Sequence, residues 1–201
     1  MIRAVAFDIG KVLLDFDYGI LVRKMAPRSR LDVPALEQLL DQSPLLAKYE
    51  SGQMNCEEFF LAVGQETGYD GTQGEFAALF EDIFTPIEEV IAMHEQIAAS
   101  GLPTCTFSNT NAMAVRHISR TYDFWPRFSN HILSHEVGAL KPDPKIYGAL
   151  ESVAGCTVNE IAYLDDRAEN VAAGISRGWQ AVHFVDPTQA RVAFRELGMP
   201  V

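Results

Sequence analysis

The fold is decided by residues 2–10, Ile-Arg-Ala-Val-Ala-Phe-Asp-Ile-Gly, a short apolar run that ends at Asp8 and Gly10. Such a run, bounded by turn residues, is typical of a buried strand, so we predict a strand over 2–7. The same character recurs at 102–107, 161–164 and 181–185, and more weakly at 131–133. Helical patterns at 87–98, from Pro144 and at 168–177 separate these strands. This alternation predicts an α/β fold with a parallel sheet covered by helices on both faces.

Residues 17–84 interrupt the alternation. They have the pattern of short helices, at 32–40, 44–51, 55–66 and 75–84, with Asp17, Asp32 and Asn55 as N-caps, and we predict no strand among them. We therefore expect a Rossmann-like core made of residues 1–16 and 85–201, with a small all-helical cap at 17–84 inserted after the first strand. Between residues 15 and 85 there are 13 Asp and Glu but only five Lys and Arg, so the cap is acidic.

Composition excludes several classes of function. The 201 residues are 48% hydrophobic and 21% charged, as in an ordinary globular protein, and the net charge of −11 disfavours a nucleic-acid surface. No apolar run approaches the roughly 18 residues of a membrane span, and the acidic start does not resemble a secretory signal. The three widely spaced cysteines, Cys56, Cys105 and Cys156, indicate free thiols in a reducing cytosol. We expect a cytoplasmic monomer or weak dimer whose partner is a small molecule.

Polar residues follow three of the predicted strands directly: Asp8, Ser108 and Asp165. Because ligands bind beyond the carboxyl ends of strands in an open parallel sheet, we expect these side chains to meet. Asp8 and Ser108 each have an ordinary explanation by themselves, as a turn residue at a strand end and as a helix N-cap. The adjacent pair Asp165-Asp166 is unusual, since neighbouring carboxylates repel unless a cation or hydrogen-bond donors offset them.

Together these residues predict phosphoryl transfer. Asp8 can attack phosphorus and form an aspartyl-phosphate. Mg²⁺, which takes one or two carboxylates and a phosphate oxygen, would lie between Asp8 and Asp165 and offset the repulsion between two anions. Lys141 would add positive charge, although a lone lysine is more often solvated. Ser108 and nearby backbone N–H groups would bind the remaining phosphate oxygens.

The chain resembles the haloacid dehalogenase-like hydrolase superfamily over essentially its whole length. The similarity lies in four motifs, at 8–13, 108–111 and 141–144 and in Asp165-Asp166 with Asn170, and in a helical cap at 17–84. Within the superfamily it is most similar to phosphatases of the α-D-glucose-1-phosphate phosphatase type and their epoxide-hydrolase-like relatives. The resemblance implies a Mg²⁺-dependent phosphatase acting on a small phosphate ester, a sugar phosphate being favoured.

The resemblance also implies a role for each motif residue. Asp8 would be the nucleophile, and Lys141 would act beside it. Ser108, Asn109 and Lys141 would bind the phosphate. Asp8, the backbone carbonyl of Gly10 and Asp165 would hold the metal, with Asp166 and Asn170 in support.

One position departs from the family pattern. Most phosphatases of the superfamily carry a second aspartate two residues after the nucleophile, which protonates the leaving oxygen, whereas this chain has Gly10. The donor could be replaced by Lys11, Asp15, Asp17 or a water held by the cap. Without a donor, we expect a rate that depends strongly on the leaving group. A glycine at this position also predicts a φ angle that other residues avoid.

Gly10 leaves two other functions open. The first is a weakly active or inactive protein that binds a phosphate ligand. The second, a metal-independent dehalogenase, would gain nothing from the acidic pair and usually has an aromatic residue at the position of Gly10. A basic group at the start of the cap could bind a second substrate anion, but the sequence favours a solvated cluster; its members are Arg23, Lys24, Arg28 and Arg30.

Overall fold

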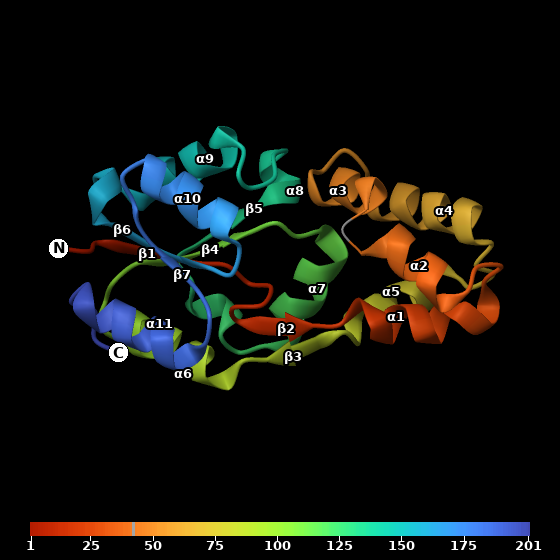
Figure 1. Cartoon of the computed structure of the whole chain (residues 1–201), viewed down its shortest axis with the longest axis horizontal. Coiled ribbons are helices and arrows are strands. Elements are labelled where there is room, and N and C mark those ends of the chain that lie inside the picture. Colours follow the sequence, from red (N-terminus) through yellow and green to blue (C-terminus); the bar gives the residue numbers. More distant parts are fainter. Residues whose placement is uncertain (42) are drawn as a thin grey trace.

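The computed structural model describes residues 1–41 and 43–201. At its centre lies a five-stranded parallel sheet with the strand order β5-β4-β1-β6-β7 (Figure 1). The strands are β1 (Ala4–Phe7), β4 (Thr104–Ser108), β5 (Asn130–Leu133), β6 (Ile161–Asp165) and β7 (Gln180–His183). All five were predicted, although β7 ends two residues before the expected end. Since β1 lies between β4 and β6, the ends of these three strands are neighbours.

Helices cover both faces of the sheet, as the alternation predicted. Successive side chains of a strand point to opposite faces. Accordingly, Val5 and Phe7 of β1 join one apolar cluster while Ala6 joins another. The first cluster lies under α6 (Glu88–Ala99), α7 (Ala112–Thr121) and α11 (Pro187–Glu196). The second lies under α9 (Pro144–Ala154) and α10 (Ala168–Ser176), and a short helix, α8 (Ser134–Val137), follows β5.

Five helices form a separate body at the right of Figure 1, which we call the helical insertion. They are α1 (Tyr18–Met25), α2 (Val33–Leu40), α3 (Pro44–Glu50), α4 (Cys56–Thr67) and α5 (Gln73–Glu81). The insertion has its own apolar cluster, in which Phe59, Phe76 and Phe80 are fully buried. The predicted caps Asp17, Asp32 and Asn55 each accept a hydrogen bond from the first turn of their helix.

The junction with the insertion corrects the sequence prediction. β2 (Leu14–Phe16) and β3 (Phe84–Pro86) pair antiparallel where the chain enters and leaves the insertion. The predicted helix at 75–84 instead spans Gln73–Glu81, and Phe84, where no strand was expected, begins β3. Thr72 and Glu75 form a capping box that starts the helix earlier. Strands of three residues carry too short a pattern to be recognised without their partner.

The far end of α3 also joins the core. The hydroxyl of Ser134 donates to the carbonyl of Glu50 at 2.6 Å, and the hydroxyl of Tyr49 accepts from the backbone N–H of Met113 at 3.1 Å. The insertion is therefore attached both at β2–β3 and at α3. Cys56, Cys105 and Cys156 are free thiols. Over the part of the chain that the structure describes, no helix has the length and apolar character needed to cross a membrane.

Candidate active site

A buried lysine links two carboxylates beyond the ends of β1 and β6. The Nζ of Lys141 lies 3.1 Å from Asp8 Oδ2 and donates to Asp165 Oδ2 at 2.6 Å and to the carbonyl of Phe107 at 2.7 Å. The Lys141 and Asp165 side chains are fully buried, and Asp8 is nearly so. The fold thus brings Lys141 together with Asp8 and Asp165, which are more than 150 positions apart in the sequence.

The electrostatics follow from this arrangement. Burial raises the pKa of Asp8 to about 7, with Lys141 lowering it and Asp165 raising it again. Burial acts to lower the pKa of Lys141, but the charges of Asp8 and Asp165 outweigh it and raise that pKa. For Asp165, the charge and hydrogen bond of Lys141 overcome burial and lower the pKa. Asp8, Asp165 and Asp166 offer ligand atoms within 4.8 Å of one another, and the ammonium of Lys141 contacts the first two of these carboxylates. This donor set fits a divalent cation.

Asp165 and Asp166 have different surroundings. Both oxygens of Asp165 are occupied: Oδ1 accepts from the backbone N–H of Arg167 at 2.8 Å and from Asn170 at 3.0 Å, while Oδ2 accepts from Lys141 and the hydroxyl of Tyr163. Asp166 is half-buried and faces the cleft. Among the described residues, no other side chain hydrogen-bonds to its carboxylate. The oxygens of Asp165 are therefore committed to donors within the protein, whereas the carboxylate of Asp166 is open to the cleft.

Ser108 at the end of β4 and Asn109 after it also have different surroundings. Ser108 is buried, and its hydroxyl lies beside Asp8, whose pKa it helps to lower. Asn109 was expected to bind phosphate, but its side chain accepts from the backbone N–H of Lys141 at 2.7 Å and donates to the carbonyl of Lys141 at 3.1 Å. The amide of Asn109 thus fixes the backbone that carries the lysine, and this corrects the expectation for its side chain.

The expected reason for Gly10 is wrong. The positive φ in this loop belongs to Lys11, at 61°, and Gly10 has none. A Cβ on Gly10 would lie 2.8 Å from the ring of Phe16. Glycine is therefore required by the close approach of an aromatic ring in β2. A longer side chain at position 10 would have to displace that ring.

The proton donors considered from the sequence are engaged elsewhere. The ammonium of Lys11 contacts Asp15 at 2.5 Å and the carbonyl of Phe16 at 2.7 Å. Asp17 accepts from the backbone N–H of Gly19 as the N-cap of α1. Asp15 and Asp17 are both exposed. The hydrogen bond with Lys11 lowers the pKa of Asp15, which is the opposite of what a carboxyl proton donor needs.

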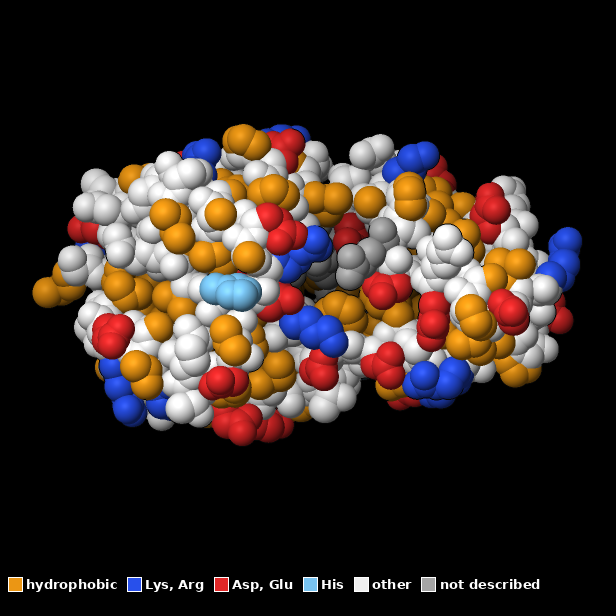
Figure 2. Space-filling view, viewed as in Figure 1, with side chains coloured by type: hydrophobic (Ala, Val, Ile, Leu, Met, Phe, Trp, Pro, Cys, Tyr) orange, Lys and Arg blue, Asp and Glu red, His pale blue; other side chains and the backbone are white. Residues whose placement is uncertain are grey.

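A cleft of about 990 Å³ separates the core from the insertion, and the space-filling view shows the surface hollowed there (Figure 2). The core side of the cleft contributes Asp8, Lys141, Asp166 and Arg167. The insertion contributes an acidic and apolar wall made of Asp17, Tyr18, Glu37, Asp41, Leu46 and Glu50.

The basic group at the start of the insertion lies outside the lining of this cleft. Arg23 pairs with Asp17, Lys24 with Asp82, and Arg28 with Asp70 and Glu75. The solvated alternative therefore fits these side chains better than the binding of a second substrate anion.

Glu50 is the residue of the insertion wall that the sequence did not reveal. It is half-buried, and burial raises its pKa to about 7, with Arg167 lowering it and Asp41 raising it. It ends an ordinary helix and belongs to no motif. Only the docking of α3 against the core brings it to the cleft, so the sequence carries no signal for it.

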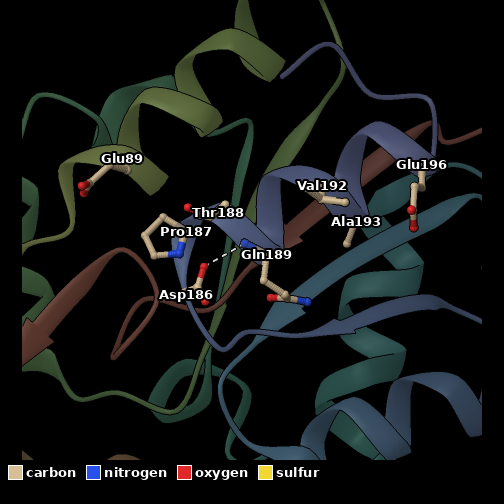
Figure 3. A pocket seen from close by; sticks show the side chains of 8 residues that line it. All are labelled: Glu89, Asp186, Pro187, Thr188, Gln189, Val192, Ala193 and Glu196. Carbon is tan, nitrogen blue, oxygen red and sulfur yellow. Dashed lines mark hydrogen bonds between the residues drawn. The ribbon is translucent and has the colours of Figure 1, made fainter.

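A second hollow, of about 700 Å³, lies between the start of α6 and α11 and shares no lining residue with this cleft (Figure 3). Asp186 points along α11, where it accepts from the backbone N–H of Gln189 at 2.8 Å as the helix N-cap. The other charged side chains of this hollow are Glu89 and Glu196, which point apart. No cation or nucleophile accompanies them among the lining residues, so the chemistry belongs to the cleft.

Known proteins resemble this chain in sequence and in fold. A family model described as haloacid dehalogenase-like hydrolase matches residues 2–178. A sesquiterpene phosphatase of Aspergillus oryzae is 22% identical over 97% of this chain and 96% of its own length. A D-ribitol-5-phosphate phosphatase of Bacteroides thetaiotaomicron is 21% identical over 90% of each. Among solved structures, an enzyme of B. thetaiotaomicron in complex with magnesium and inorganic phosphate superimposes with a TM-score of 0.79, at 18% identity, over 91% of this chain and 94% of that one.

Proposed function

We propose that this chain, which belongs to the haloacid dehalogenase-like hydrolase family, is a Mg²⁺-dependent phosphatase that forms an aspartyl-phosphate at Asp8. The observation that carries the proposal is the buried Lys141 between Asp8 and Asp165, next to the free carboxylate of Asp166. Two similar proteins are named as phosphatases, and a solved structure of similar fold holds magnesium and phosphate.

The metal would be held by Asp8, by the backbone carbonyl of Gly10 and by Asp166. When bound, it supplies positive charge that offsets the repulsion between carboxylates and phosphate oxygens. We assign Asp166 rather than Asp165 because the oxygens of Asp165 already accept from Lys141, Tyr163, Asn170 and the backbone of Arg167.

The residues of the chain have distinct tasks in this proposal. Asp8 attacks phosphorus, and the backbone N–H of Ile9, which donates to Asp8 Oδ1 at 2.7 Å, orients its carboxylate. The ammonium of Lys141 faces the same carboxylate and offsets charge on the transferred phosphoryl group. Ser108 binds a phosphate oxygen at the end of β4. Asn109 positions Lys141, and Asn170 positions Asp165.

The residues of the insertion wall indicate the class of substrate. We propose that residues 17–84 act as a cap over a core made of 1–16 and 85–201, and that the cap selects the leaving group. Its lining offers the carboxylate acceptors Asp17, Glu37, Asp41 and Glu50, and no Lys or Arg of the insertion appears among the described lining residues. Such a wall suits the hydroxyls of a sugar or polyol phosphate and repels a second anionic group. The free thiols fit a cytoplasmic protein.

The test is hydrolysis of an aryl phosphate such as 4-nitrophenyl phosphate, followed by a panel of phosphorylated sugars and polyols. We expect turnover that disappears with EDTA and returns with Mg²⁺. Turnover of the aryl phosphate that is unchanged after exhaustive chelation would contradict the metal assignment. Turnover of a 2-haloacid together with none of any phosphate ester would favour the dehalogenase alternative. Binding of phosphate without turnover would leave the inactive ligand-binding alternative.

A further inference from the structure

We infer that Glu50, at the end of α3, donates the proton to the leaving oxygen, the task for which position 10 offers no side chain. The inference rests on the proposed phosphatase function. An oxygen of Asp8 bonds to phosphorus, the bond from phosphorus to the ester oxygen breaks, and that oxygen takes the electron pair and the proton of Glu50. The alcohol leaves. Water then attacks the aspartyl-phosphate, its proton passes to the Glu50 carboxylate, and inorganic phosphate and the Asp8 carboxylate are released.

The position of Glu50 is set by the core. Its side chain lines the same cleft as Asp8 and Lys141. Its backbone carbonyl accepts from Ser134, and the hydroxyl of Ser134 also accepts from the backbone N–H of Thr110 at 2.9 Å. Thr110 lies two residues after Ser108, in the loop that follows β4. The end of α3 is therefore fastened to the loop that carries the proposed phosphate-binding hydroxyl.

Residues on either side of Glu50 hold the same junction. Tyr49 is buried, stacks on Phe59 with ring centres 4.4 Å apart, and accepts from the backbone N–H of Met113. Gly52 lies so close to the core that a Cβ there would be 2.2 Å from the carbonyl of His135. Since residues on both sides of Glu50 contact the core, the backbone of Glu50 is fixed relative to the core.

The charge environment suits a proton donor that later becomes a base. Within the described part of the chain, the Glu50 carboxylate has no hydrogen-bond partner. The charged and titratable groups that face it are Arg167 across the cleft, Asp41 after α2 and Tyr18 of α1. Burial raises the pKa of Glu50 to about 7, Arg167 counteracts this and Asp41 adds to it. A carboxyl group with this pKa can give up a proton and take one back near neutral pH.

Other titratable groups of the cleft lining are committed or exposed. His183 is exposed, and its Nε2 contacts the carbonyl of Asp166 at 2.8 Å. Glu169 pairs with Arg167 at the surface. Glu37 and Asp41 are exposed carboxylates. Among the described lining residues of the insertion, Glu50 alone combines a carboxyl group, partial burial and a raised pKa.

The test compares leaving groups in wild type, Glu50→Gln and Glu50→Asp, with Glu66→Gln as the matched control. Glu66 is an exposed carboxylate of the insertion outside the cleft lining. The readout is kcat/KM with Mg²⁺ for 4-nitrophenyl phosphate, whose leaving oxygen departs without protonation, and for an alkyl phosphate such as glycerol 1-phosphate. This parameter covers the steps up to departure of the leaving group, so it isolates protonation of the ester oxygen from hydrolysis of the aspartyl-phosphate.

We expect Glu50→Gln to lower kcat/KM for the alkyl phosphate by about 10²–10⁴-fold. For the aryl phosphate the loss should be a few fold at most, Glu50→Asp should recover part of the alkyl activity, and Glu66→Gln should match wild type. In wild type the alkyl kcat/KM should fall as pH rises above about 7, where the donor loses its proton, and this limb should be missing in Glu50→Gln.

An equal loss on both substrates, or none on the alkyl phosphate, would overturn the role of Glu50. A merely structural role would lower both rates together and would also lower the melting temperature. Wild type that hydrolyses neither ester with Mg²⁺ would instead overturn the proposed function, and the role of Glu50 with it. The aryl rate of wild type thus separates the two failures.

Discussion

The two walls of the cleft are built on opposite principles. On the core wall, the charged groups that surround Asp8 are buried and saturated: Lys141 makes three contacts below 3.2 Å, and Asp165 accepts from four different residues. On the insertion wall, the carboxylates of Glu37 and Asp41 are exposed, and that of Glu50 is partly buried. A saturated wall can hold atoms at fixed positions, as bond-making requires, whereas a loosely held wall can change its side chains at little cost to stability. We therefore place the attack on phosphorus on the core, and the choice of the leaving group and its protonation by Glu50 on the insertion.

Replacement of the nucleophile on the core wall should have the largest effect on activity. Asp8→Asn keeps the size and hydrogen-bonding capacity of the side chain but removes the attacking charge. We expect turnover to fall at least about 10³-fold with little change in melting temperature, because the variant also relieves repulsion from Asp165 and Asp166. Steady-state rates and thermal unfolding measure the two effects. Retention of a substantial part of the wild-type rate would remove Asp8 from the role of nucleophile.

Substitutions in the acidic pair should affect two different properties of the core wall: Asp166 should affect metal binding, and Asp165 should affect stability. Asp166→Asn should raise the Mg²⁺ concentration needed for half-maximal activity by about 10–100-fold and leave the melting temperature nearly unchanged. Asp165→Asn leaves a buried ammonium without its closest partner, so we expect a loss of about 3 kcal/mol in the free energy of unfolding. Magnesium titration of activity and urea unfolding distinguish the variants. The opposite pattern would return the metal to Asp165.

Substitutions of the exposed residues on the insertion wall should change activity least. Glu37→Lys replaces an exposed acid of the lining with a cation. For a sugar bisphosphate relative to a monophosphate, we expect kcat/KM to improve about fivefold at low ionic strength, with the gain shrinking as salt screens the exposed charge. A competition assay at two salt concentrations measures this. A fall in activity on every substrate would show that Glu37 belongs to the fixed part of the site.

Much of the core could be predicted from the sequence because its signals are local. An apolar run that ends in a polar turn predicts a strand, and Asp17, Asp32 and Asn55 predict helix starts, since a cap acts within its own turn. The parallel topology then brings residues at the ends of different strands together. For this reason the neighbourhood of Asp8 and Asp165 was predictable.

Features that depend on packing between distant segments were not predictable. The three-residue strands β2 and β3 become strands only by pairing with each other. The motif fixes the adjacency of Asp165 and Asp166, but their division of work depends on which carboxylate faces Tyr163 and Asn170. Similarly, the ring of Phe16 leaves no room for a Cβ at Gly10, and Glu50 lines the cleft because α3 docks on the core.

In the proposed mechanism, the phosphoryl group is transferred to Asp8 on the core wall before water hydrolyses the aspartyl-phosphate. The direct measurement is mass spectrometry of the proteolytic peptide that contains Asp8, after rapid acid quench of enzyme mixed with substrate and Mg²⁺. We predict that this peptide gains one phosphoryl group in wild type, and gains none in Asp8→Asn or in EDTA. Release of phosphate in a first turnover without phosphorylation of this peptide, or phosphorylation of a different peptide, would contradict the account.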